Sequence, residues 1–101
     1  MNSKTIAFNP AQYLESEEDI ALFVSEALST GDYKHIAHCL GIVARSKGMS
    51  SIAKETGLAR EQLYRSFSED GNPSLKSTLA VIKALGVSLA ATPTKTLQTS
   101  P

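Results

Sequence analysis

The chain has 101 residues, of which 42% are hydrophobic and 6% are aromatic. This length suits one domain that closes a small core without a metal or a disulfide network. The single cysteine, Cys39, has no partner for an internal disulfide, and neither a secretory signal nor a membrane-spanning run is evident. The sequence therefore excludes a disulfide-stabilised secreted domain and a transmembrane helix, and we expect a cytoplasmic protein.

The formal net charge is zero, but the charges are divided unequally along the chain. Residues 1–33 carry one lysine against six acidic residues, whereas residues 34–101 carry nine lysines and arginines against four acidic residues. Affinity for DNA comes largely from neutralised phosphates, so only the second part has the charge that a nucleic-acid surface needs. One end of the chain suits an anionic partner and the other a cationic one.

The first predicted helix covers residues 16–30. Ser16 is placed to cap it, acidic residues fill its first turn, where the helix dipole favours them, and Gly31 ends it. Its apolar residues recur on one face: Ile20, Phe23, Val24, Ala27 and Leu28. Before it, within an N-terminal arm of residues 1–14, we expect only a short helical turn capped by Asn9.

A second helix is predicted from Asp32, its N-cap, to Gly48. The residues expected on its core face are Tyr33, Ile36, Ala37, Leu40, Val43 and Ala44. Gly41 lies inside this helix, at a cost of about 0.5 to 1 kcal/mol relative to alanine. Such a cost indicates that a neighbouring helix approaches closely at Gly41.

Two short helices separated by a turn are predicted next. Ser50 or Ser51 is placed to cap the first, which ends at Gly57, and the second begins near Arg60. The methyl group of Ala53 lets crossing helices come close, and Gly57 supplies the positive φ that a tight turn requires. Four apolar residues are expected to anchor the pair to the core: Ile52, Leu58, Leu63 and Phe67. The spacing predicts a helix-turn-helix, whose second helix enters the major groove of DNA.

A last helix is expected after a turn, with Asn72 as its N-cap and Pro73 as its first residue. The residues predicted for its core face are Leu75, Leu79, Ile82 and Leu85. Residues 87–91 either form a short strand or lie against the body of the protein. We therefore assign residues 15–90 to one all-α domain and residues 91–101 to a disordered tail.

The outward face of the helix that begins near Arg60 carries side chains of the kinds that read base edges. Arginine pairs with guanine, glutamine with adenine and glutamate with cytosine, and each good contact is worth about 1 to 3 kcal/mol. The candidates are Arg60, Glu61, Gln62, Tyr64 and Arg65. The candidate phosphate contacts are Ser50, Ser51, Lys54, Asn72 and Lys76. A solvated charged face without a ligand is the alternative interpretation.

His35, His38 and Cys39 are the only residues that suggest a metal site, and two or three ligands without a second cluster fall short of structural zinc. Cys39 is better explained as a small apolar residue beside Leu40. No acidic partner for a nucleophile, glycine-rich phosphate loop or pair of catalytic carboxylates is evident. We expect no metal, no cofactor and no enzymatic activity.

Residues 13–89 contain, in this order, the segments ALSTGD, GIVARSKGM, IAKETGL, LYRSFSEDGNP and VIKALG. These segments resemble the addiction-module antitoxins with a lambda-repressor-like, Cro-type DNA-binding domain. The resemblance implies a five-helix domain whose DNA-reading segment is Ala59 to Arg65. It also implies an antitoxin that neutralises a toxin similar to the mRNA interferases and represses its own operon as a homodimer.

Ala59 departs from the family pattern, because antitoxins of this kind often have serine there. A serine hydroxyl would cap the DNA-reading helix, so alanine should cost about 1 kcal/mol of capping. The departure also removes a hydroxyl that can contact a phosphate. It therefore bears on the affinity for DNA rather than on the mode of binding.

The acidic residues Glu17, Glu18 and Asp19 are the candidate toxin-binding site, because ribonuclease-type toxins are usually basic. The same acids stabilise a helix N-terminus, which explains them without a toxin. Two further functions stay open as alternatives: a stand-alone transcriptional regulator without a toxin partner, and a protein-interaction module that keeps the fold without binding DNA.

Overall fold

The computed structural model describes residues 14–94, which contain five α-helices and no strand. The helices are α2 (Glu17–Ser29), α3 (Tyr33–Lys47), α4 (Met49–Thr56), α5 (Arg60–Ser66) and α6 (Leu75–Ala84). The prediction of an all-helical domain with five helices is confirmed for this part of the chain. Residues 87–94 form a loop rather than a strand. The turn expected at Asn9 and the tail expected beyond residue 94 lie outside the described residues.

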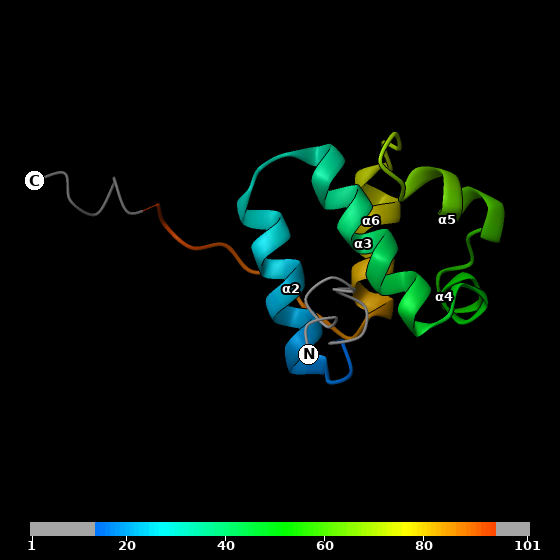
Figure 1. Ribbon diagram of the computed structural model, residues 1–101, viewed down its shortest axis with the longest axis horizontal. Coiled ribbons are helices and arrows are strands. Elements are labelled where there is room, and N and C mark those ends of the chain that lie inside the picture. Colours follow the sequence, from blue (N-terminus) through cyan, green and yellow to red (C-terminus); the bar gives the residue numbers. More distant parts are fainter. Residues whose placement is uncertain (1–13, 95–101) are drawn as a thin grey trace, which may run out of the picture.

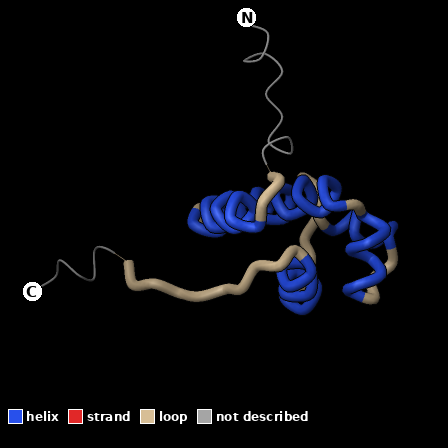
Figure 2. The backbone as a smooth tube through the Cα atoms, turned by 90° about the horizontal axis from the view of Figure 1, so that it is seen from below, coloured by secondary structure: helices blue, strands red, loops and turns tan. Residues whose placement is uncertain are grey.

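Helix α3 is the centre of the arrangement. It packs against α2 on one side, and it also contacts α4, α5 and α6. Figure 1 shows α2 and α5 on opposite sides of α3. In Figure 2 the segment after α6 leaves the helices as an extended loop. Helix α3 therefore lies between α2, which has the acidic first turn, and α5 (Figure 1).

The core draws apolar side chains from every helix. Its most deeply buried members are Ile20, Val24, Leu40, Val43, Ile52, Leu63, Phe67, Val81, Ile82 and Leu85. Of the face predicted for α2, the residues Ile20, Val24 and Ala27 are buried, while Phe23 and Leu28 pack partly buried against the core. Burial of these side chains is the main source of stability, at about 1.5 to 3 kcal/mol for each large apolar residue.

The close approach predicted at Gly41 is confirmed. A Cβ atom at this position would overlap the backbone carbonyl oxygen of Phe67, the residue that follows α5. Helix α3 and the end of α5 thus touch backbone to backbone. The neighbouring Leu40 and Val43 are fully buried around this contact.

The start of α4 differs from the prediction. Its N-cap is Gly48, which makes no side-chain hydrogen bond, and the helix begins at Met49. Ser50 and Ser51 lie inside its first turn instead of capping it. The reason is that Gly48 has a φ of 108°, a conformation that glycine adopts freely, so the helix is capped two residues before Ser50.

The start of α6 also differs from the prediction. The helix begins at Leu75 and its N-cap is Ser74, so Asn72 and Pro73 precede the helix instead of opening it. Ser74 has the extended backbone of an N-cap, and its Oγ accepts a hydrogen bond of 3.0 Å from the backbone N–H of Ser77. This hydrogen bond satisfies an N–H group that Asn72, two residues earlier, does not reach in the structure.

The core faces predicted for α6 and α3 are partly wrong. Leu75 is 73% exposed and Leu79 is 45% exposed, while Ile82 and Leu85 are buried as predicted. The buried row of α6 runs through Ser77, Val81 and Leu85, which are spaced by four residues, and this row turns the first two leucines toward solvent. Tyr33, which was also predicted for the core, is 57% exposed. It is the first residue of α3 and so lies at the end of the helix.

Candidate nucleic-acid interface

Helices α4 and α5 are two separate helices joined by residues 57–59. Helix α4 ends at Gly57, whose φ of 79° and ψ of 7° are left-handed, and the Gly57 N–H donates to the Ala53 carbonyl at 2.9 Å. The Thr56 hydroxyl fixes the same turn, since it donates to the carbonyl of Ile52 at 2.8 Å and accepts from the N–H of Leu58 at 3.2 Å. The bend predicted between the two helices is confirmed.

The two faces of α5 lie as the sequence predicted. Leu63 and Phe67 have exposed fractions of 0% and 1%, so they anchor the helix and its end to the core. The candidate base-reading residues occupy the remaining surface: Arg60, Glu61, Tyr64 and Arg65 are exposed, and Gln62 is half-buried. Both arginines are therefore available to a ligand outside the protein.

Ala59 is the N-cap of α5 and makes no side-chain hydrogen bond. Its backbone is extended, with φ −69° and ψ 142°, which is the conformation of an N-cap. The Ala59 carbonyl accepts the first hydrogen bond of the helix, from the N–H of Leu63 at 3.0 Å. The predicted loss of a hydroxyl cap at this position is confirmed.

Tyr64 is shared by two arginines. The guanidinium carbon Cζ of Arg60, on α5 itself, lies 5.9 Å from the centre of the Tyr64 ring. The Cζ atom of Arg45, on α3, lies 5.7 Å from the same centre. Both distances are within the range of cation–π attraction. The structure thus adds to the candidate interface a residue, Arg45, that the sequence analysis did not select.

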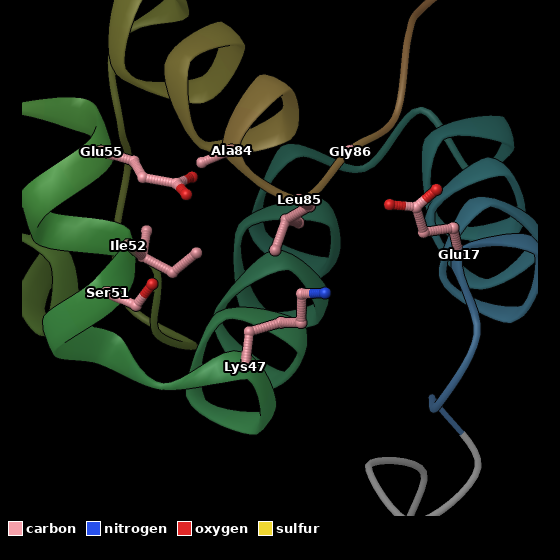
Figure 3. A pocket seen from close by; sticks show the side chains of 8 residues that line it. All are labelled: Glu17, Lys47, Ser51, Ile52, Glu55, Ala84, Leu85 and Gly86. Atoms are coloured by element: carbon pink, nitrogen blue, oxygen red, sulfur yellow. The ribbon is translucent and has the colours of Figure 1, made fainter.

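The predicted phosphate contacts on α4 lie on its solvent-exposed side, with Ser50 and Lys54 one helical turn apart. Ser50, Ser51 and Lys54 are all exposed. Ser51, however, lines a cavity of about 390 Å³ together with Glu17 and Glu55, whose carboxylates point into it in Figure 3. Lys47 lines the same cavity (Figure 3), so its charges are two carboxylates against one ammonium group, a balance that does not favour a phosphate at Ser51.

Asn72 and Lys76 lie near the start of α6, and both are exposed. Asn72 borders a largely apolar groove of about 280 Å³ that it shares with Tyr33 and Leu75. This groove follows the first half of α3, whereas Arg45 lies in the last turn of that helix. The structure therefore does not bring Asn72 into the group formed by Arg45 and Tyr64.

The candidate toxin-binding acids occupy the first turn of α2. Glu17, Glu18 and Asp19 are exposed, and Ser16 Oγ accepts a hydrogen bond of 3.1 Å from the N–H of Asp19. The predicted serine cap is confirmed. Glu17 also lies against Gly86, whose absent Cβ would meet the Glu17 carboxylate at 3.0 Å. The three acids thus form an exposed patch, and one of them, Glu17, lies against the loop that follows α6.

The sulfur of Cys39 lies 3.4 Å from His35 Nε2, in the i, i+4 pairing expected from the sequence. Burial raises the pKa of the Cys39 thiol, so it stays protonated at neutral pH. Within residues 14–94, no three or more histidine, cysteine or acidic side chains are grouped so that they could hold a metal ion. The same part of the chain has no helix that is both long and apolar enough to span a bilayer.

Comparison with known proteins identifies the family. Residues 4–93 match the model of a family described as probable addiction module antidote protein. The chain is 40% identical over 80 residues to an uncharacterized protein of Haemophilus influenzae, and the alignment covers 79% of this chain and 82% of that protein. No solved structure matches the chain significantly. Because the family match takes in nearly the whole sequence, the protein belongs to the family of probable addiction module antidote proteins.

Proposed function

We propose that the protein is a DNA-binding antitoxin that neutralises a cognate toxin similar to the mRNA interferases and represses its own operon. Membership in an antidote family implies a toxin partner. The observation that carries the DNA-binding part is the surface of α5: its apolar residues are fully buried, and Arg60, Glu61 and Arg65 are left exposed on a helix that follows a tight turn. An exposed polar face on a helix after a tight turn supports the proposal, because a helix-turn-helix presents its second helix to the major groove in this way.

A homodimer fits this function better than a monomer. Helix α5 has 7 residues, so one copy can contact only a few base pairs. Two copies related by a two-fold axis read two half-sites about 34 Å apart, and their discrimination energies add. We therefore propose that the protein binds a palindromic operator as a dimer, with Arg60, Gln62, Tyr64 and Arg65 as the main candidates for base contacts.

The test of DNA binding is a titration of the purified protein against the DNA upstream of its gene, with an unrelated duplex as reference. We expect salt-sensitive binding that favours the upstream DNA. Arg60→Ala and Arg65→Ala should each remove about 1 to 3 kcal/mol of this preference. Lys34→Ala, an exposed cation at the first turn of α3, is the charge-matched control and should leave the preference unchanged. Equal affinity of the wild-type protein for both duplexes would contradict operator recognition.

The proposal places the toxin on the acidic start of α2. Glu17, Glu18 and Asp19 provide an exposed negative patch, and a ribonuclease toxin needs a positive surface to attract RNA. Replacing the three acids by lysine should weaken toxin binding and leave operator binding unchanged. Glu26→Lys, at the other end of α2, controls for the effect of added charge on that helix.

Co-expression with the product of the neighbouring gene tests the toxin partner directly. We expect the two proteins to co-purify and growth to be rescued from the toxin. Rescue that survives the triple lysine replacement would move the toxin contact away from α2. Operator binding without any complex or rescue would instead identify a stand-alone transcriptional regulator.

A further inference from the structure

We propose that Arg45, which lies outside α4 and α5, binds a phosphate of the DNA backbone, and that its stacking on Tyr64 joins it to Arg60 in one cationic surface. The inference rests on the proposed DNA-binding function and extends it to a third helix. It assigns to α3 a role in binding that neither the sequence pattern of the helix-turn-helix nor the family description contains.

The position of Arg45 follows from the tightest contact in the fold. At Gly41 the backbone of α3 meets the carbonyl of Phe67. Arg45 lies one helical turn after Gly41, and Tyr64 lies one turn before Phe67, so both side chains emerge beside the same contact. The Nη1 atom of Arg45 is 3.4 Å from the place that a Cβ on Gly41 would occupy. The guanidinium is thus directed along α3 toward α5.

The chemistry of this arrangement leaves Arg45 ready for an anion. A guanidinium that packs against an aromatic ring uses its face, and its N–H groups project from the edge. Within residues 14–94, the guanidinium groups of Arg45 and Arg60 neither donate a hydrogen bond to the protein nor form an ion pair. Their donors are therefore unsatisfied by protein groups, while their orientation is already restricted by Tyr64.

Arg45 and Arg60 carry like charges and both lie close to the Tyr64 ring, so the surface around this ring is positively charged and attracts an anion. Arg45 is exposed, and so are Arg60 and Tyr64. An extended polyanion that runs along the surface suits this arrangement. Since Arg45 does not lie on α5, the backbone that borders the groove is the part of DNA it meets.

The test measures how operator affinity depends on salt for Arg45→Ala, Arg45→Lys and the control Lys34→Ala. A lost phosphate contact lowers the slope of log affinity against log salt by about 0.9 per bound protomer. Raising salt from about 50 to about 200 mM should then cost Arg45→Ala about 3.5-fold less affinity per protomer than it costs the wild type. The loss in affinity should be the same for operator and unrelated DNA, because phosphates carry no sequence information.

Arg45→Lys keeps the charge and removes the guanidinium group, so it should keep the wild-type slope. Lys34→Ala should keep both slope and affinity. Thermal melting of each variant shows whether it is folded, and Arg45 is exposed, so we expect little change.

The outcomes separate the two proposals. If the wild type binds its upstream DNA and Arg45→Ala has an unaltered slope, Arg45 does not contact phosphate and this inference is overturned, while the proposed function stands. A uniform loss of slope in Arg45→Ala and in Lys34→Ala would assign the effect to overall charge and would also overturn it. If the wild type shows no DNA binding at all, both the function and the inference fail.

Discussion

Helices α5 and α6 each bury one face in the same core, yet they expose opposite kinds of side chain. The exposed face of α5 carries two arginines, a glutamate and a tyrosine. The exposed face of α6 carries Leu75 and Leu79, with Lys76 and Lys83 beside them. The difference shows that the anchoring residues set how a helix is oriented, and that the function of its free surface is decided by other residues. Leucine offers nothing to a phosphate, so the proposed DNA surface consists of α5 and the neighbouring Arg45 and leaves out the apolar face of α6.

The largest expected effect is on the free energy of unfolding, when a buried residue that anchors a helix is replaced and the result is compared with replacement of an exposed residue. Phe67→Ala should lower the free energy of unfolding by about 3 to 5 kcal/mol, because the ring is 1% exposed and its loss leaves a cavity under α5. Leu75→Ala removes an exposed side chain and should change it by less than about 0.5 kcal/mol. Chemical denaturation measures both. A cost at Leu75 as large as at Phe67 would mean that α6 is covered in solution.

A second prediction tests how α5 is held against α3. Gly41→Ala places a methyl group on the Phe67 carbonyl, which is backbone and cannot rotate away, so the two helices must move apart. We expect a loss of about 1 to 3 kcal/mol in the free energy of unfolding.

In an open helix the same exchange would be stabilising, which makes the sign of the effect diagnostic. Ser46→Ala, an exposed position on α3, is the control and should stay within about 0.5 kcal/mol of the wild type. Increased stability of Gly41→Ala would show that α5 does not rest on α3 as described.

The smallest expected effect concerns the side-chain hydrogen bond of the N-cap residue, which α6 has and α5 lacks. Ala59→Ser should raise the free energy of unfolding by about 1 kcal/mol, because the backbone already has the conformation of an N-cap and only the hydroxyl is missing. Ser74→Ala should lower it by a similar amount, since Ser74 accepts the Ser77 N–H. Thermal melting of the two variants should shift in opposite directions. Two shifts of the same sign would contradict the assignment of these caps.

The position and the buried face of α5 could be predicted from the sequence, because the apolar spacing, the turn residue and the polar residues all indicate the same helix. Leu63 and Phe67 are spaced by four residues, Gly57 marks the preceding turn, and nearly every other side chain is polar. In α6 the signals conflict. Two leucines in its first half outweigh Ser77 in a count of hydrophobicity, although the small serine packs inward and the leucines do not. The start of α6 was misplaced for a similar reason, since Asn72 and Ser74 are both competent caps and only the fold decides between them.

Arg45 could not be selected from local pattern alone, because its partner Tyr64 lies on another helix. The available signal was Gly41, which correctly predicted a close approach without naming the neighbour. Once Phe67 is known to be that neighbour, the pairing of Arg45 with Tyr64 follows from helical periodicity. The contact at Gly41 thus fixes which side chains of α3 lie next to which side chains of α5.

The separation of charge across α3 has a consequence for how the protein approaches its partners. Although the sum of charges is zero, α2 carries four acidic residues and no basic one, whereas α5, on the other side of α3 (Figure 1), carries two arginines and one glutamate, and this difference gives the molecule an electric dipole. The field of a nucleic acid exerts a torque on such a dipole and turns the basic pole forward during diffusion, before any contact forms. In the proposed function the acidic pole would then face solvent, so a positively charged toxin would still be able to bind a protein that is already bound to DNA.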